Sequence, residues 1–102
     1  MGSEIPGLSR KEMVIMKLLV SSGRDMYGLQ FVDESSGVLK RGTIYVTLGR
    51  LEDKGYVTSR REPPRDGVSI PRRLYKVTGL GARVFHALEG VGGRAWLKEA
   101  LA

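Results

Sequence analysis

Segment 61–71 constrains the fold of this chain more than any other part of its sequence. It holds three prolines and the turn pair Asp66-Gly67. Because proline lacks the backbone N–H that a helix or an inner strand uses, neither can continue through this segment. The flanking residues 56–60 and 72–78 are rich in valine, tyrosine and threonine, which favour strands. The sequence therefore predicts a β-hairpin with a long loop at its tip.

Helical patterns precede the hairpin. Ser9 and Glu12 have the spacing of a capping box and open a helix that continues to Val20. Asp25 is expected to cap a second helix over residues 26–36.

Residues 43–54 predict a third helix, with Ile44, Leu48 and Leu51 as its buried stripe. Four other side chains fall within about 60° of one another on a different face, which we expect to be exposed: Thr43, Thr47, Arg50 and Lys54.

After the hairpin, Thr78 can cap a fourth helix. Its expected inward stripe is Leu80, Val84, Ala87, Leu88 and Val91. Residues 94–102 are expected to resume a helix. The whole chain of 102 residues has room for one domain, with a core over about residues 9–78 and a C-terminal region over about 79–102.

The first helix is apolar nearly all round. Seven of the eight residues from Met13 to Val20 are apolar, whereas a single core-facing stripe needs fewer. We therefore expect this helix to be buried on two sides, by its own domain and by a second surface.

Positive charge is concentrated in one part of the chain. Residues 40–76 hold ten basic and four acidic residues, a net charge of +6, and the other residues net to zero. Such one-sided charge is typical of a protein that binds a polyanion, although basic loops can also serve solubility alone.

Other function classes find little support. Without cysteine and with His86 as the single histidine, the chain has no set of residues for a zinc site or a histidine relay, so we expect no metal and no cofactor. Gly79-Leu80-Gly81 lacks the third glycine of a dinucleotide fingerprint, and we expect no enzyme. The longest apolar run is too short to span a bilayer, and the absence of cysteine fits a cytoplasmic protein.

Three short helices followed by a cationic hairpin predict an α+β, mostly helical winged helix-turn-helix. In such a fold a helix enters the major groove and the hairpin, or wing, reaches adjacent phosphates.

Three stretches carry a more specific signal: MYGLQ at 26–30, GTIYVTLGRLEDKGYV at 42–57 and RRLYKVTGLG at 72–81. In order and spacing they resemble the second helix, the recognition helix and the wing strand of the PadR family of bacterial transcriptional regulators. The resemblance covers about residues 9–90. Val46 stands where the family usually has proline.

The resemblance implies a homodimer in which the C-terminal helix packs against helix 1 of the partner. It also implies repression by operator binding, and release by a small aromatic ligand as in several family members.

The candidate contacts to double-stranded DNA divide by role. Thr43, Val46 and Thr47 are expected at base edges, Arg50 at a guanine or a phosphate, and the wing arginines at phosphates. The two tyrosines either touch the DNA backbone or are core rings with the hydroxyl at the rim. The full set is Tyr27, Lys40, Arg41, Thr43, Tyr45, Val46, Thr47, Arg50, Lys54, Arg60, Arg61, Arg65, Arg72 and Arg73.

The candidate dimer interface is apolar: Met13, Met16, Val20, Val84, Leu88, Trp96, Leu97 and Leu101. Trp96 is either core of this interface or an aromatic wall for a planar ligand between the subunits. His86 is expected on the solvated side of the fourth helix.

A winged helix that binds another protein, such as an anti-repressor module, is the alternative from a different class. Modules of that kind usually lose the cationic recognition face that this sequence keeps.

Overall fold

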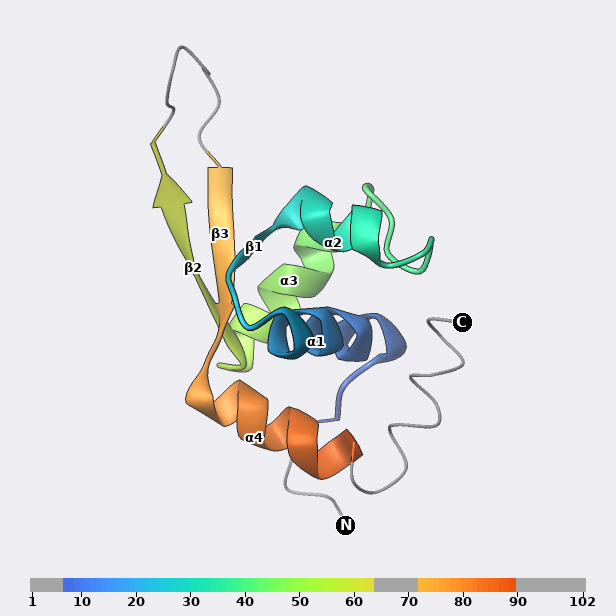
Figure 1. Ribbon diagram of the computed structural model, residues 1–102, viewed down its shortest axis with the longest axis vertical. Coiled ribbons are helices and arrows are strands. Elements are labelled where there is room, and N and C mark those ends of the chain that lie inside the picture. Colours follow the sequence, from blue (N-terminus) through green and yellow to red (C-terminus); the bar gives the residue numbers. More distant parts are fainter. Residues whose placement is uncertain (1–6, 64–71, 90–102) are drawn as a thin grey trace.

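The computed structural model describes residues 7–63 and 72–89. Three helices lie against a small antiparallel sheet, and a fourth follows the last strand (Figure 1). The helices are α1 (Arg10–Ser22), α2 (Gly28–Glu34), α3 (Ile44–Asp53) and α4 (Gly79–Leu88). The strands are β1 (Met26–Tyr27), β2 (Val57–Glu62) and β3 (Arg72–Val77), in the order β1-β3-β2. This is the mostly helical α+β winged-helix fold that the sequence predicts.

The caps of α1 and α4 form as predicted. Ser9 accepts a hydrogen bond from the Glu12 amide at 3.2 Å, and the Ser9 amide donates to the Glu12 carboxylate at 2.7 Å. Thr78 accepts from the Gly81 amide at 2.9 Å and donates to the Gly55 carbonyl at 2.7 Å. Each cap satisfies amides that would otherwise lack a partner within the helix.

The predicted start of the second helix is wrong. Met26 and Tyr27 form β1 and pair with Tyr75 and Leu74 of β3, so the sheet has three strands rather than two. This pairing buries the Met26 side chain in the core. α2 therefore begins only at Gly28, and Asp25 does not cap it.

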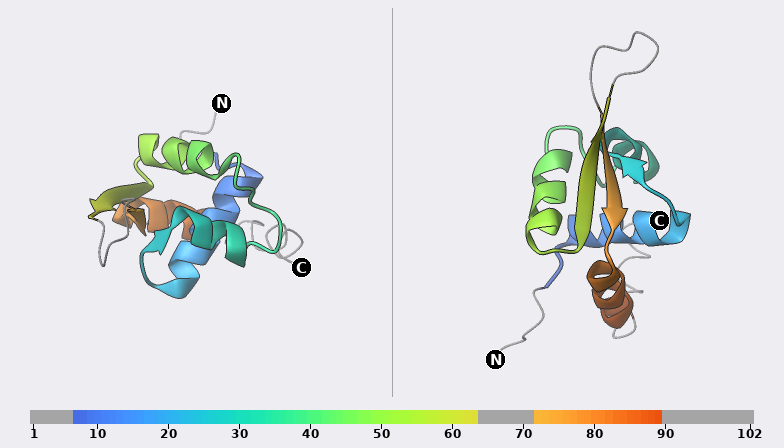
Figure 2. Two further views of the ribbon diagram at one scale, coloured as in Figure 1. Left: turned by 90° about the horizontal axis from the view of Figure 1, so that it is seen from above. Right: turned by 90° about the vertical axis from the view of Figure 1, so that its left-hand side faces the viewer.

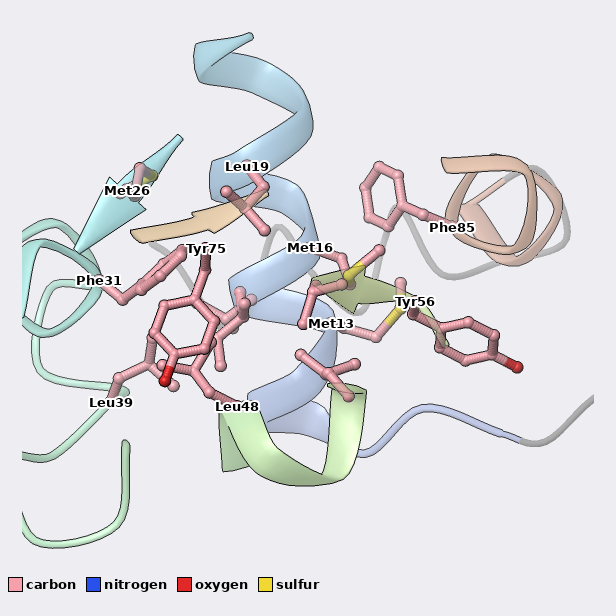
Figure 3. Close-up of a cluster of buried hydrophobic side chains, with 14 of the residues drawn as sticks. Met13, Met16, Leu19, Met26, Phe31, Leu39, Leu48, Tyr56, Tyr75 and Phe85 are labelled. Carbon is pink, nitrogen blue, oxygen red and sulfur yellow. The ribbon is translucent and has the colours of Figure 1, made fainter. Parts of the chain in front are cut away.

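α1 runs through the centre of the core (Figure 3). Met13 and Met16 are buried within a single chain, because the other helices and β3 surround α1. Phe85 points from α4 toward Met16 and covers the side that α2 and α3 leave open. The expectation that the apolar surface of α1 exceeds what one chain can bury is therefore wrong.

α4 presents a different stripe from the predicted one. Gly81 lies against the backbone of Tyr56, where a Cβ atom would clash, and this contact sets the rotation of the helix. Val84 and Phe85 are consequently buried, while Leu80 is 45% exposed and Ala87 is also exposed.

Candidate nucleic-acid interface

The outward side of α3 carries side chains that the core does not use. Tyr45 is 53% exposed and Val46 is 57% exposed, and Arg50 is exposed one turn after Val46. In the described part of the chain, Arg50 makes no ion pair or hydrogen bond. Because i and i+4 neighbours share a helix face, Val46 and Arg50 form one accessible edge.

Tyr45 lies beside the start of α2. A Cβ atom at Gly28 would lie 2.6 Å from the Tyr45 ring, so the ring fits only against a glycine. The contact fixes the ring while more than half of the residue stays open to solvent. Tyr45 is thus neither core nor free of contacts.

Thr47 is not exposed as predicted. It is 6% exposed, and its hydroxyl donates to the Thr43 carbonyl at 3.2 Å. On the helical wheel Thr47 lies next to Leu51, and packing at that edge of the stripe covers it. Thr43 itself is exposed and accepts a hydrogen bond from Lys11 Nζ at 3.5 Å.

The Lys54 ammonium is occupied by α1. It lies 2.9 and 3.0 Å from the two carboxylate oxygens of Glu12 and donates to the Gly7 carbonyl at 3.0 Å. Glu12 is 2% exposed, so its charge needs a cation within the protein. The expectation that Lys54 belongs to the open cationic face of α3 is therefore wrong: this side chain ties the end of α3 to the start of α1.

β2 is the sheet edge beside α3, as the right-hand view of Figure 2 shows. Residues that are paired across strands share a face of the sheet. Arg61 pairs with Arg73, and both are on the face of buried Val57 and Tyr75. Arg73 donates to Ser59 Oγ at 3.0 Å.

On the same face, Ser59 Oγ donates to Glu52 of α3 at 2.6 Å. The wing is thus bonded directly to α3. The same carboxylate, after burial itself, raises the pKa of the Tyr75 phenol.

The opposite face of the sheet holds a second group of wing residues. Arg60 contacts the Asp25 carboxylate at 2.6 Å, and this hydrogen bond raises the pKa of the guanidinium further. The Arg72 guanidinium lies 4.9 Å from the centre of the Tyr27 ring, a cation–π geometry. Tyr27 also donates to Glu62 at 2.6 Å, so the phenol is already engaged.

The other predicted residues divide by their surroundings. Lys40 and Arg41 are exposed in the turn before α3. Val84 is buried, whereas Val20 and Leu88 are half-buried beside the core. His86 is exposed, as expected. Four predicted residues lie outside the described part of the chain: Arg65, Trp96, Leu97 and Leu101.

Sequence reasoning missed three contributors to this surface. Glu12 and Asp25 neutralise cations that were expected to face DNA, and no local pattern signals either pair. Gly49, in the middle of α3, did carry a signal, because glycine inside a helix costs stability. In residues 7–63 and 72–89 no cluster suited to a metal ion occurs, and no helix there is long and apolar enough to cross a membrane.

Comparisons with known proteins agree with this geometry. The model of the PadR-like family of transcriptional regulators matches residues 15–87. A PadR family regulator from Clostridium difficile R20291 is 23% identical, with a TM-score of 0.70 over 92% of this chain and 100% of that chain. A second, from Eggerthella lenta DSM 2243, is 25% identical, with a TM-score of 0.67 over 84% and 77%. No curated protein matches significantly.

Proposed function

The chain belongs to the PadR-like family of transcriptional regulators, and from that premise we propose that it is a homodimeric repressor of an inverted-repeat operator. Family membership makes it a DNA-binding regulator rather than an enzyme. The observation that carries the proposal is the outward face of α3. It exposes Val46 and Arg50 without using either in the core.

The surroundings of α3 support entry into a major groove. Cationic Lys40 and Arg41 precede the helix, and Arg61 and Arg73 extend from the adjacent sheet. These side chains flank α3 and can hold phosphates while its exposed side chains meet base edges. Exposed Glu52 and Asp53 disfavour phosphate near the C-terminal end, so we propose that the first half of α3 reads the DNA.

Dimerisation is the second part of the proposal. A two-fold dimer would hold its two copies of α3 about 34–36 Å apart, one turn of duplex, and would select an inverted repeat. Exposed Leu80 and half-buried Leu88 of α4 support an interface at this helix, together with the region after it.

The experiment is a selection of bound genomic fragments, followed by gel shifts of the enriched sequence at two salt concentrations. We expect an inverted repeat, salt-sensitive affinity and a complex containing two chains. Sedimentation of the free protein should give a dimer at micromolar concentration. A protein that retains no DNA at low salt would contradict the proposal and favour the protein-binding alternative.

Release by a small aromatic ligand is the third part, and it rests on Trp96 alone. For such coupling the ligand must bind the DNA-free arrangement more tightly than the DNA-bound one. We expect saturable quenching of tryptophan fluorescence by one planar aromatic compound, with a matching loss of operator affinity. Unchanged fluorescence across a panel of such compounds would remove this part and leave Trp96 as interface core.

A further inference from the structure

Gly49 lies at the centre of α3, where glycine weakens a helix. Neither its backbone nor its packing requires it. Its φ is not positive, and a Cβ atom built there would meet nothing within 4 Å. Gly28 differs, because a Cβ atom there would collide with the Tyr45 ring.

The position of Gly49 suggests a role for the missing side chain. Val46 precedes it by three residues and so lies on the same side of α3, with 57% of its surface exposed. An exposed isopropyl group therefore borders bare backbone on the outward side of the helix. Arg50 adjoins this surface.

We propose that Gly49 and Val46 form the point of closest approach to DNA and receive a thymine 5-methyl group in the major groove. The inference rests on the proposed function, because it requires α3 to enter that groove. The thymine methyl group is the apolar feature that a major groove presents. Dispersion contacts weaken within 0.5–1 Å of added distance, roughly the displacement that an extra methyl group on α3 would cause.

A phosphate fits this surface poorly. Backbone amides in the middle of a helix already donate to carbonyls one turn earlier, so the Gly49 amide is not available to an anion. Exposed Glu52 and Asp53 follow on the next turn and repel phosphate. An apolar group on a base edge meets neither obstacle.

The first test is Gly49→Ala in the full chain, measured on the operator selected by the wild-type protein. We expect the melting temperature to rise by about 3–6 °C, because alanine favours the helix. Operator affinity should nevertheless fall at least about fivefold, while affinity for unrelated DNA stays unchanged.

Gly79→Ala is the matched control. Gly79 is exposed at the first position of α4, and an added Cβ atom there meets only the Arg83 guanidinium at 3.6 Å. This variant should bind the operator like the wild type.

The second test replaces each operator thymine in turn with uracil, which removes only the methyl group. The wild-type protein should lose about fourfold in affinity at one position of each half-site, the worth of one buried methyl group. Gly49→Ala and Val46→Ala should lose little more at that position, because the contact is already gone.

The outcomes separate the inference from the proposed function. A wild-type protein that selects no DNA overturns both. Operator binding by Gly49→Ala at wild-type strength overturns the inference alone, as does an equal loss on operator and unrelated DNA. Indifference to every uracil substitution overturns the thymine assignment.

Discussion

The outward face of α3 and the two long strands of the wing differ in how far their polar groups are already occupied. On α3, Val46 and Arg50 face solvent with no polar partner among the described residues. In the wing, Arg60 is held by Asp25 and Arg72 lies over Tyr27, whereas Arg61 makes no such contact. A count of basic residues therefore overstates the number of phosphate contacts. The carboxylates nearby decide which cations remain available.

The largest expected effect concerns the cation of α3 that is not available. In Lys54→Met the buried Glu12 carboxylate loses its ammonium partner, and we expect the free energy of unfolding to fall by about 3 kcal/mol. Urea unfolding measures this loss. The salt dependence of DNA binding should stay that of the wild type.

A stable Lys54→Met protein with a shallower salt dependence would instead return Lys54 to the DNA interface. The double variant with Glu12→Gln is the control. It should recover much of the lost stability, because the uncompensated charge is removed.

Arg50 is the next strongest test, since it belongs to the open side of the comparison. We expect Arg50→Ala to weaken operator and unrelated DNA alike by about 2 kcal/mol, as for loss of a charged hydrogen bond to phosphate. Arg50→Lys should restore much of both affinities. A loss confined to the operator would show that Arg50 reads a guanine instead.

The wing allows the comparison to be sharpened within one strand. Arg61→Ala should reduce the slope of log affinity against log salt by about 0.9, the value of one phosphate contact. Arg60→Ala should change this slope less, because Asp25 already holds that side chain. Asp25→Asn should release Arg60 and steepen the slope. Equal slopes for all three variants would contradict the division of the wing arginines.

Local signals in the sequence were enough to predict much of the fold. The caps at Ser9 and Thr78 depend on residues three positions away, and the buried stripe of α3 depends on helical period alone. β1 could not be predicted in this way. A strand of two residues exists only because β3 supplies its partner from the far end of the hairpin.

The candidate site shows the same limit. A helical wheel correctly assigns Arg50 to the exposed side of α3, but it contains no information about what packs beside the helix. Lys54 shares that side on the wheel, and Glu12 of another helix withdraws it from solvent. Thr47 lies at the edge of the buried stripe, where tertiary packing decides exposure.

Thr47 provides the smallest expected effect and a direct check of that correction. Thr47→Val keeps the shape of the side chain and removes a hydroxyl whose hydrogen bond goes to the Thr43 carbonyl of the same chain. Because such bonds to the preceding turn add little to helix stability, we expect stability and operator affinity to change by less than about 0.5 kcal/mol. Val46→Ala, on the exposed edge, is the matched comparison and should weaken the operator complex measurably more. If gel shifts show Thr47→Val losing as much operator affinity as Val46→Ala, the Thr47 hydroxyl turns toward DNA in the complex, and the occupied and open parts of α3 are not separated as proposed.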